Sequence, residues 1–164
     1  MIEAIEAART PEGRPIRAIV HQGWAKLGEG LQVSDNIFLL NDPVPHDWLF
    51  PFCSSCCHHG GAGTMAAGLR VGLPTIVVPF FGDQPFWGSV VAAKQVRPEP
   101  TFNTDLTAKN LKEAIEFCYR PDIIENAKEL GKLLSQEDGV GAGVDAFLRK
   151  VPAAHGKFMV EIWE

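Results

Sequence analysis

Short apolar runs alternate with stretches of helical periodicity over the first two thirds of the chain. The apolar runs are β-prone and lie at residues 17–21, 36–40, 54–57 and 74–79. Between and before them, residues 2–8, 64–71 and 86–95 show the spacing of helices, and three prolines break the segment 42–51. Strands that are apolar on both faces and separated by helices are typical of a parallel sheet covered on both sides. The pattern therefore predicts an α/β, Rossmann-like fold.

The last third of the chain is predicted to be helical. Thr107 is suited to cap the first helix, Pro121 opens a second, and a third is expected over 138–150, although three glycines weaken it. The apolar positions expected to face inward are Leu111, Ala114, Ile115 and Cys118 in the first helix and Ile124, Ala127, Leu130 and Leu134 in the second. No pattern follows Pro152, so we expect one domain over 1–152 and a tail over 153–164.

The composition and net charge are those of a globular protein that does not bind nucleic acid. The 164 residues are 46% hydrophobic and 21% charged, as in a globular domain, and the formal net charge of -5 argues against a nucleic-acid partner. The first residues lack the basic and apolar regions of a signal peptide. No stretch approaches the roughly 20 apolar residues of a membrane helix. We therefore expect a cytoplasmic protein with no transmembrane segment.

The candidate chemistry lies in a glycine-rich loop that follows an apolar strand and precedes a helix. The loop consists of His58, His59, Gly60, Gly61, Ala62, Gly63 and Thr64. Glycines let main-chain N–H groups approach an anion, and the positive end of the helix dipole adds roughly 0.3–1 kcal/mol. A histidine at the strand end can donate a hydrogen bond to a phosphate oxygen. The loop therefore predicts a site for a diphosphate.

The same residues satisfy a second motif. The stretch from Gly61 to Ala66 fits the G-x-G-x-x-A dinucleotide fingerprint, with Asp83 at about the distance of a ribose partner. A dinucleotide-dependent oxidoreductase is therefore a rival hypothesis. Two features oppose it, because the loop follows two earlier strands and because the fingerprint leaves the histidine pair and the Asp83-Gln84 dipeptide unused.

The stretch HHGGAGTMAAGLRVGLPTIVVPFFGDQPFWG resembles the donor-site signature of the sterol 3-beta-glucosyltransferases, which are UDP-glycosyltransferases with a GT-B fold. Upstream, NDPVPHDWLFP is similar to the family's segment at the nucleotide site. The resemblance runs over about residues 3–152 and is most specific over 45–88. It implies the carboxy-terminal, nucleotide-sugar-binding half of an enzyme of lipid metabolism that transfers glucose from UDP-glucose to a sterol 3-hydroxyl.

The resemblance also implies roles for single residues. The loop from His58 to Thr64 would hold the diphosphate of UDP, and Asp83 and Gln84 would bind the hydroxyls of the transferred sugar. A carboxylate accepts from hydroxyls while an amide both donates and accepts, which suits this pair. The residues expected near the uracil are Trp24, Val44 and Pro45. Plant relatives carry a ribose-binding glutamate where this chain has Ala66, which leaves the ribose contact unexplained.

The same family pattern implies what the chain lacks. The acceptor pocket and the catalytic base belong to an N-terminal domain, so we expect no catalytic residue here and no sugar transfer by this chain alone. The reaction is expected to be inverting and to need neither metal nor cofactor. The family's first strand of this domain is also missing, so we expect the remaining strands to pair directly or the chain to form a homo-oligomer. The full-length parent could be membrane-peripheral, and a non-catalytic binding or assembly protein is the alternative.

Several residues also have purely structural interpretations. Cys53, Cys56 and Cys57 fit a strand of buried cysteines better than a zinc site, because a second spaced pair is absent. His59 could be packed or solvated, and Asp83 could cap the following helix. The aromatic residues Phe80 and Phe81 are expected in the core, and Phe86 and Trp87 are expected to serve packing.

Overall fold

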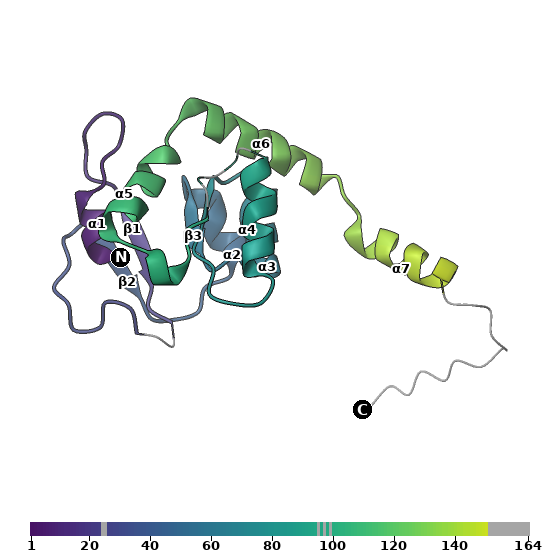
Figure 1. The fold of residues 1–164 in the computed structure, drawn as a ribbon, viewed down its shortest axis with the longest axis horizontal. Helices are drawn as coiled ribbons and strands as arrows, with labels where there is room; N and C mark the ends of the chain where they lie inside the picture. Colours follow the sequence, from purple (N-terminus) through teal and green to yellow (C-terminus); the bar gives the residue numbers. More distant parts are fainter. Residues whose placement is uncertain (24–25, 95, 97, 99, 151–164) are drawn as a thin grey trace.

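The first part of the chain, where the structure describes it, contains four strands with helices before, between and after them, and only helices follow the last strand (Figure 1). The structure, a computed structural model, describes residues 1–23, 26–94, 96, 98 and 100–150, so Trp24 and the tail 153–164 lie outside the described residues. The elements in chain order are α1 (Ile2–Ala7), β1 (Ala18–His21), β2 (Ile37–Leu40), α2 (His46–Leu49), β3 (Cys56–His58), α3 (Ala62–Arg70), β4 (Thr75–Val77), α4 (Gln84–Ala93), α5 (Ala108–Phe117), α6 (Pro121–Ser135) and α7 (Gly139–Lys150). The expected α/β architecture is confirmed.

The described strands form two separate parallel pairs. Strand β1 pairs with β2, in register from Ala18–Ile37 to His21–Leu40. Strand β3 pairs with β4, in register from Cys56–Thr75 to His58–Val77. No hydrogen-bonded ladder joins the two pairs in the part of the chain that the structure describes. The expectation that the remaining strands close the sheet by pairing directly is therefore wrong for these residues.

Strand β1 keeps one unpaired edge. The Ala18 amide donates to the Asn36 carbonyl and the Gln22 amide to the Leu40 carbonyl, both at 2.9 Å. In a parallel strand, alternate residues turn their main-chain groups to opposite edges, so those of Ile19 point away from β2. The Ile19 side chain is 50% exposed, and Phe38 of β2 is 62% exposed. An open strand edge with exposed apolar side chains favours pairing with another chain.

We therefore expect the chain to self-associate through the open edge of β1. The substitution Ile19→Lys is expected to shift the equilibrium toward the monomer. A lysine on an open edge opposes strand addition because its charge would be buried in the new interface. Sedimentation velocity at increasing protein concentration measures the effect, and Val71→Lys, at an exposed valine of a helix end, is the matched control. A wild-type chain that stays monomeric at every concentration contradicts this expectation.

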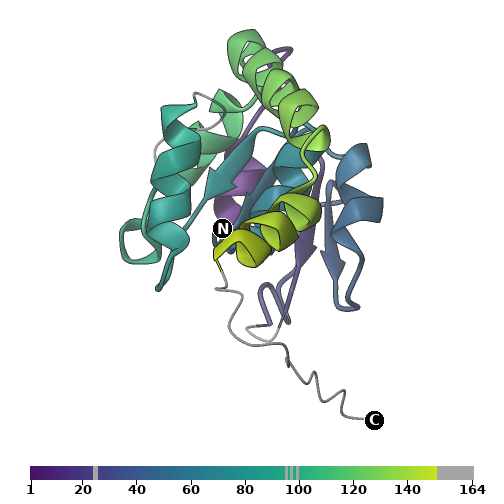
Figure 2. The ribbon, with the colours of Figure 1, turned by 90° about the vertical axis from the view of Figure 1, so that its right-hand side faces the viewer.

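The two strand pairs nevertheless share one hydrophobic core. Its buried residues include Val20 of β1, Ile37 of β2 and Ile76 of β4, together with Ala4 and Ile5 of α1, Leu111 and Ile115 of α5, and Cys118 at the end of α5. Val77 faces the other way, because neighbouring strand residues alternate between faces. It joins a second core with Met65 and Leu69 of α3 and with Val91, Val96 and Ala127. Helices therefore cover both faces of the strand layer (Figure 2).

The carboxy-terminal helices follow the predicted pattern with one difference in α6. The Thr107 hydroxyl accepts from the Asn110 amide at 3.1 Å while the Asn110 side chain accepts from the Thr107 amide at 2.8 Å, so the predicted cap is present. In α6, Ala127 is buried and Leu130 and Leu134 pack against the second core, as predicted. Ile123 and Gly131 are also buried, whereas Ile124 is only half-buried. Helix α6 approaches α3 through the glycine at 131, where no side chain holds the helices apart.

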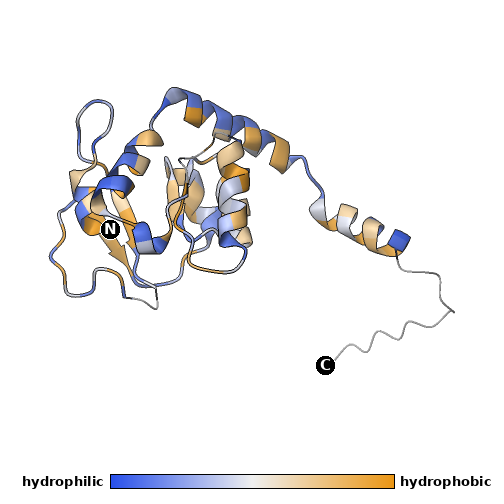
Figure 3. Ribbon diagram, viewed as in Figure 1, coloured by the Kyte–Doolittle hydropathy of each residue, from blue (hydrophilic) through white to orange (hydrophobic). Residues whose placement is uncertain are grey.

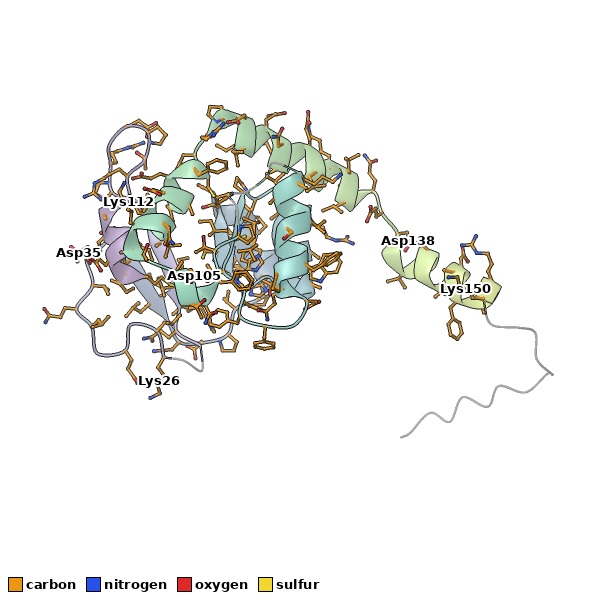
Figure 4. All side chains as sticks on the ribbon, viewed as in Figure 1. Lys26, Asp35, Asp105, Lys112, Asp138 and Lys150 are labelled. Atoms are coloured by element: carbon orange, nitrogen blue, oxygen red, sulfur yellow. The ribbon has the colours of Figure 1, made fainter. Side chains whose placement is uncertain are left out.

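Helix α7 stands away from the body of the molecule (Figure 1). The Asp138 carboxylate accepts from the Gly141 amide at 2.8 Å and caps the helix start, and Figure 4 labels Asp138 and Lys150 at its two ends. No α7 residue is buried, and Phe147 is 63% exposed. Figure 3 shows apolar positions along α7, and no other described element covers them. None of the described helices combines the length and the apolar character needed to cross a membrane.

Candidate anion-binding site

Two helices begin at the same edge of a strand pair. Strand β3 ends at His58 and β4 at Val77, and the two strands are parallel, so both carboxyl ends lie at one edge. Helix α3 begins at Ala62 and α4 at Gln84, a few residues after these strand ends. In open parallel sheets, ligands bind in the crevice outside the carboxyl ends of the strands. A ligand is therefore expected at the two loops of this edge, residues 59–61 between β3 and α3 and residues 78–83 between β4 and α4.

The two loops touch each other at Gly60. Its φ of 92° lies in the left-handed region that favours glycine. A Cβ at this position would lie 2.7 Å from the Val77 Cγ1 atom and 3.2 Å from the Gln84 carbonyl oxygen. Only a residue without a side chain fits so close to β4 and to the start of α4. The glycine-rich loop and the Asp83-Gln84 pair, more than twenty residues apart in sequence, are therefore neighbours in space.

The start of α3 presents main-chain donors. Gly61 is the N-cap residue, and no side chain accepts from the first turn of this helix. The N–H groups of Ala62, Gly63 and Thr64 have no acceptor within an α-helix, because an α-helix leaves its first N–H groups unpaired. Ala62 and Gly63 are exposed to solvent. This helix end therefore offers several oriented donors and a partial positive charge to an anion.

His58 has a defined protonation pattern. Its Nδ1 atom accepts a hydrogen bond from the Gly60 amide at 2.9 Å, so the proton of the neutral ring resides on Nε2. That Nε2 atom is buried and has no hydrogen-bond partner among the described residues. A buried donor left unpaired costs roughly 1–3 kcal/mol. An anionic oxygen that reached Nε2, after movement of the atoms that cover it, would satisfy this donor.

Burial also determines the charge of His58. Burial, together with smaller contributions from the charges of His59 and His46, lowers the pKa of His58 to about 4. The ring is therefore neutral near pH 7 and acts there as a hydrogen-bond donor without a positive charge.

Because the unfolded chain takes up a proton at His58 near pH 6.5 and the folded chain only near pH 4, the unfolded state binds more protons between these values. We expect the free energy of unfolding to fall by about 2 kcal/mol between pH 7 and pH 4.5 through this residue. His58→Gln should lose this part of the pH dependence. Urea unfolding of both proteins at the two pH values measures it, and equal slopes would contradict the assignment.

His59 differs from its neighbour. It is exposed, and its ring lies over Gly61, where a Cβ would meet the His59 Nε2 atom at 2.5 Å. The two histidine rings meet edge to face, with their centroids 6.2 Å apart. His59 therefore lies at the mouth of the loop and packs on the N-cap residue.

Gln84 is built into the loop between β4 and α4. It is buried, and its Oε1 atom accepts from the amides of Phe80 at 2.8 Å and Phe81 at 3.1 Å. A role in sugar binding would therefore have to use the amide NH₂ group. The expectation that Phe80 and Phe81 belong to the core is wrong, because their side chains are 56% and 75% exposed. Strand β4 has ended before them, and Gln84 holds only their main chain.

Asp83 is exposed and does not cap α4 with its side chain. Its Oδ2 atom instead accepts from the indole Nε1 of Trp87 at 2.8 Å. Sequence reasoning assigned Trp87 to packing only and missed this bond. The spacing could have indicated it, because residues four apart on a helix lie on the same face. Phe86, expected to pack, is 61% exposed and meets the Trp87 ring edge to face.

The residues expected near the uracil lie at the start of α2. The Pro45 carbonyl accepts from the amides of Trp48 at 3.2 Å and Leu49 at 3.0 Å, so Pro45 precedes the first helical turn. Pro45 is exposed and Val44 half-buried. Helix α2 packs against α3, which brings this segment near the helix that starts at the glycine-rich loop.

The cysteines are spread over different faces. Cys56 is half-buried with its sulfur 3.4 Å from the Thr75 hydroxyl, and burial raises its pKa to about 11. Cys57 is exposed, so the expected strand of buried cysteines is only partly correct. Neighbouring strand residues point to opposite faces, so Cys56 and Cys57 do not converge. Within the described ranges, no group of three or more His, Cys, Asp or Glu residues is arranged to hold a metal ion.

The sequence is similar to a family described as erythromycin biosynthesis protein CIII-like, C-terminal domain, over residues 17–132. It is 50% identical over 137 residues to sterol 3-beta-glucosyltransferase UGT80B1 of Arabidopsis thaliana, covering 83% of this chain and 22% of that protein. It is also 38% identical over 161 residues to UDP-sugar-dependent glycosyltransferase 52 of Dictyostelium discoideum, covering 83% of this chain and 9% of that protein. The chain therefore spans less than a quarter of the length of these relatives.

Solved structures share the fold. Glycosyltransferase VinC in complex with DTDP matches with a TM-score of 0.74 and 22% identity, over 90% of this chain and 36% of that one. Spinosyn rhamnosyltransferase SpnG complexed with thymidine diphosphate matches with a TM-score of 0.69 and 20% identity, over 90% of this chain and 40% of that one. Both matches cover only part of the larger protein, as the sequence relatives do.

Proposed function

The chain belongs to the family of erythromycin biosynthesis protein CIII-like C-terminal domains and is a homologue of the sterol 3-beta-glucosyltransferases, and from this premise we propose that it binds UDP-glucose. In this proposal it is the donor-binding domain of a glycosyltransferase. His58 and the main chain of residues 60–64 hold the diphosphate. Asp83 and Gln84 bind the sugar, and the segment with Val44 and Pro45 lies on the uracil side.

One observation supports this proposal above the others. The glycine-rich loop and the start of α4 are in contact at Gly60, at the carboxyl edge of β3 and β4. An anion at the α3 terminus would therefore lie beside Asp83, which is the arrangement that a sugar diphosphate needs. The loop also contains a buried N–H donor, at Nε2 of His58, that has no partner among the described residues. These features support the proposed binding of a diphosphate and an adjoining polyol.

The proposed reaction is displacement at the anomeric carbon with inversion. The bond from the acceptor hydroxyl oxygen to this carbon forms, the bond to the diphosphate oxygen breaks, and the hydroxyl proton passes to a base. The α3 terminus and His58 would stabilise the charge that develops on the departing diphosphate. Because helix donors and a histidine serve this purpose, we propose that the site needs no metal ion.

Titration calorimetry with UDP, UDP-glucose and NAD in the presence of a chelator tests the proposal. We expect UDP and UDP-glucose to bind and NAD not to bind. Preference for NAD would instead support the dinucleotide-dependent oxidoreductase, whose fingerprint Gly61 to Ala66 also satisfies. Absence of binding by all three ligands would contradict the proposal and favour a protein that keeps the fold for assembly.

A second proposal concerns the activity of a longer enzyme in which this chain would be the donor-binding domain. The relatives named sterol 3-beta-glucosyltransferases are more than four times as long as the matched region, and we propose a sterol 3-hydroxyl as the acceptor of such an enzyme. In this proposal the base and the acceptor pocket lie outside this chain, and the full-length protein meets its acceptor at a cytoplasmic membrane surface. Fusion of this chain to the N-terminal part of a relative, followed by a transfer assay with UDP-glucose, tests whether its donor domain is competent.

A further inference from the structure

The carboxylate of Asp83 is held by a side chain from the first turn of the helix that follows it. Asp83 immediately precedes α4, and its Oδ2 atom accepts from Trp87 Nε1 at 2.8 Å. The main chain supports the same geometry, because the Trp87 amide donates to the Asp83 carbonyl at 3.1 Å. The two residues therefore share two hydrogen bonds, one through the main chain and one through the side chains.

Trp87 is itself fixed in position. It is half-buried and packs against the second core, whose members Met65 and Leu69 belong to α3. The Phe86 ring meets it edge to face with the centroids 5.2 Å apart. An indole packed in this way has little rotamer freedom, so its N–H points in a constant direction.

Asp83 has few other restraints. It is exposed, and its side chain makes no cap bond to the start of α4. Gln84, in contrast, is buried with Oε1 engaged by two main-chain amides. Without the indole, the Asp83 carboxylate would sample several rotamers in water. Ordering a side chain on binding costs roughly 0.5–1.5 kcal/mol, a cost that a pre-formed hydrogen bond removes.

We propose that Trp87 is a positioning residue for sugar recognition, which orients the Asp83 carboxylate so that Oδ1 and the remaining lone pair of Oδ2 face the hydroxyls of the donor sugar. This inference rests on the proposed binding of UDP-glucose and extends it by assigning a role to a residue that does not touch the ligand. Trp87 acts through Asp83 only, so its removal affects the sugar and not the nucleotide.

A double-mutant cycle on the full 164-residue chain tests this inference. The proteins are the wild type, Trp87→Phe, Asp83→Ala and the double variant, and titration calorimetry gives the dissociation constants of UDP and of UDP-glucose. Phenylalanine keeps an aromatic ring in the core and removes the N–H. We expect Trp87→Phe to weaken UDP-glucose about fivefold, consistent with a hydrogen bond to a charged but solvent-exposed group, and to leave UDP within about twofold. In the Asp83→Ala background, the same change should have no further effect on either ligand.

The ratio of the two affinities separates positioning from a purely structural role. Loss of packing in Trp87→Phe would weaken UDP and UDP-glucose equally, and that result overturns the inference. An unchanged UDP-glucose affinity, or a loss that persists without Asp83, overturns it as well. If the wild type binds UDP and UDP-glucose but Trp87→Phe has no selective effect, only this inference is contradicted. If the wild type binds neither ligand, the proposed function is contradicted as well. Thermal unfolding of each variant verifies that the fold is kept.

Discussion

Gly60→Ala is expected to lower the affinity for UDP at least tenfold and the free energy of unfolding by about 3 kcal/mol. The backbone of Gly60 has a φ of 92°, which strains any residue with a Cβ. The added Cβ would also lie 2.7 Å from Val77 Cγ1 and 3.2 Å from the Gln84 carbonyl oxygen. The loop must therefore move away from β4 and α4. Overpacking of this kind typically costs about 1–3 kcal/mol, and the backbone strain adds to it.

The effect on binding follows from the same movement. The Gly60 amide donates to His58 Nδ1 and so keeps the ring proton on Nε2. A displaced loop loses this bond together with the alignment of the α3 terminus and Asp83. Urea unfolding and calorimetry with UDP measure the two losses. Gly63→Ala is the control for stability, because a Cβ at position 63 meets no atom within 4 Å and alanine favours the helix by up to about 1 kcal/mol. Equal stability of the Gly60 and Gly63 variants would contradict the close approach.

The sequence was sufficient to predict the elements that form this edge. The apolar runs, the glycines and the cap at Thr107 are local signals, and each identifies an element within a residue or two. That β3 and β4 end at one edge follows from parallel pairing alone. The contact at Gly60 could be anticipated only in part, because a glycine signals a special backbone or a close neighbour and does not identify the neighbour.

Other features depend on tertiary contacts that no local pattern contains. Phe80 and Phe81 follow a buried apolar run and therefore resemble core residues, but Gln84 binds their amides and the rings turn outward. At the start of α6, Ile123 is buried in place of Ile124, and the close contact of Gly131 with the end of α3 helps decide which face of α6 turns inward. In α7 the amphipathic pattern is present, yet its apolar face has no covering element among the described residues. Periodicity identifies a face and leaves its partner undetermined.

The candidate site was predictable as a set of residues and less so as a set of interactions. His58, the loop and Asp83 were expected on the strength of the family resemblance, and the structure brings them to one edge. The binding roles assigned to them stay predictions. The hydrogen bonds within the site were not predicted: Gln84 accepts from two amides of the preceding loop, and Trp87 donates to Asp83. These bonds join residues three or four apart, so the spacing was visible in the sequence, but which side chains meet depended on the fold.

The close main-chain approach between α6 and the end of α3 predicts a second large loss of stability. At Gly131 of α6, a Cβ would lie 2.9 Å from the Cα and N atoms of Gly72 and from the carbonyl oxygen of Leu69. All three atoms belong to the backbone at the end of α3, so no side chain can turn aside to make room. Gly131→Ala must therefore separate α6 from α3 and disturb the packing of Ala127 in the second core.

We expect Gly131→Ala to lower the free energy of unfolding by about 3 kcal/mol, which outweighs the better helix propensity of alanine. Gly143→Ala in α7 is the control, because its Cβ meets open space and α7 joins neither core, so the global unfolding transition should stay unchanged. The anion site lies at the opposite end of α3 from Leu69, and the folded Gly131 variant should keep the UDP affinity of the wild type within about twofold. Urea unfolding and calorimetry measure both quantities on the same samples. A variant as stable as the wild type would contradict the contact between α6 and α3, whereas a parallel loss of UDP affinity would mean that α3 moves as a rigid body and carries its first turn away from Asp83.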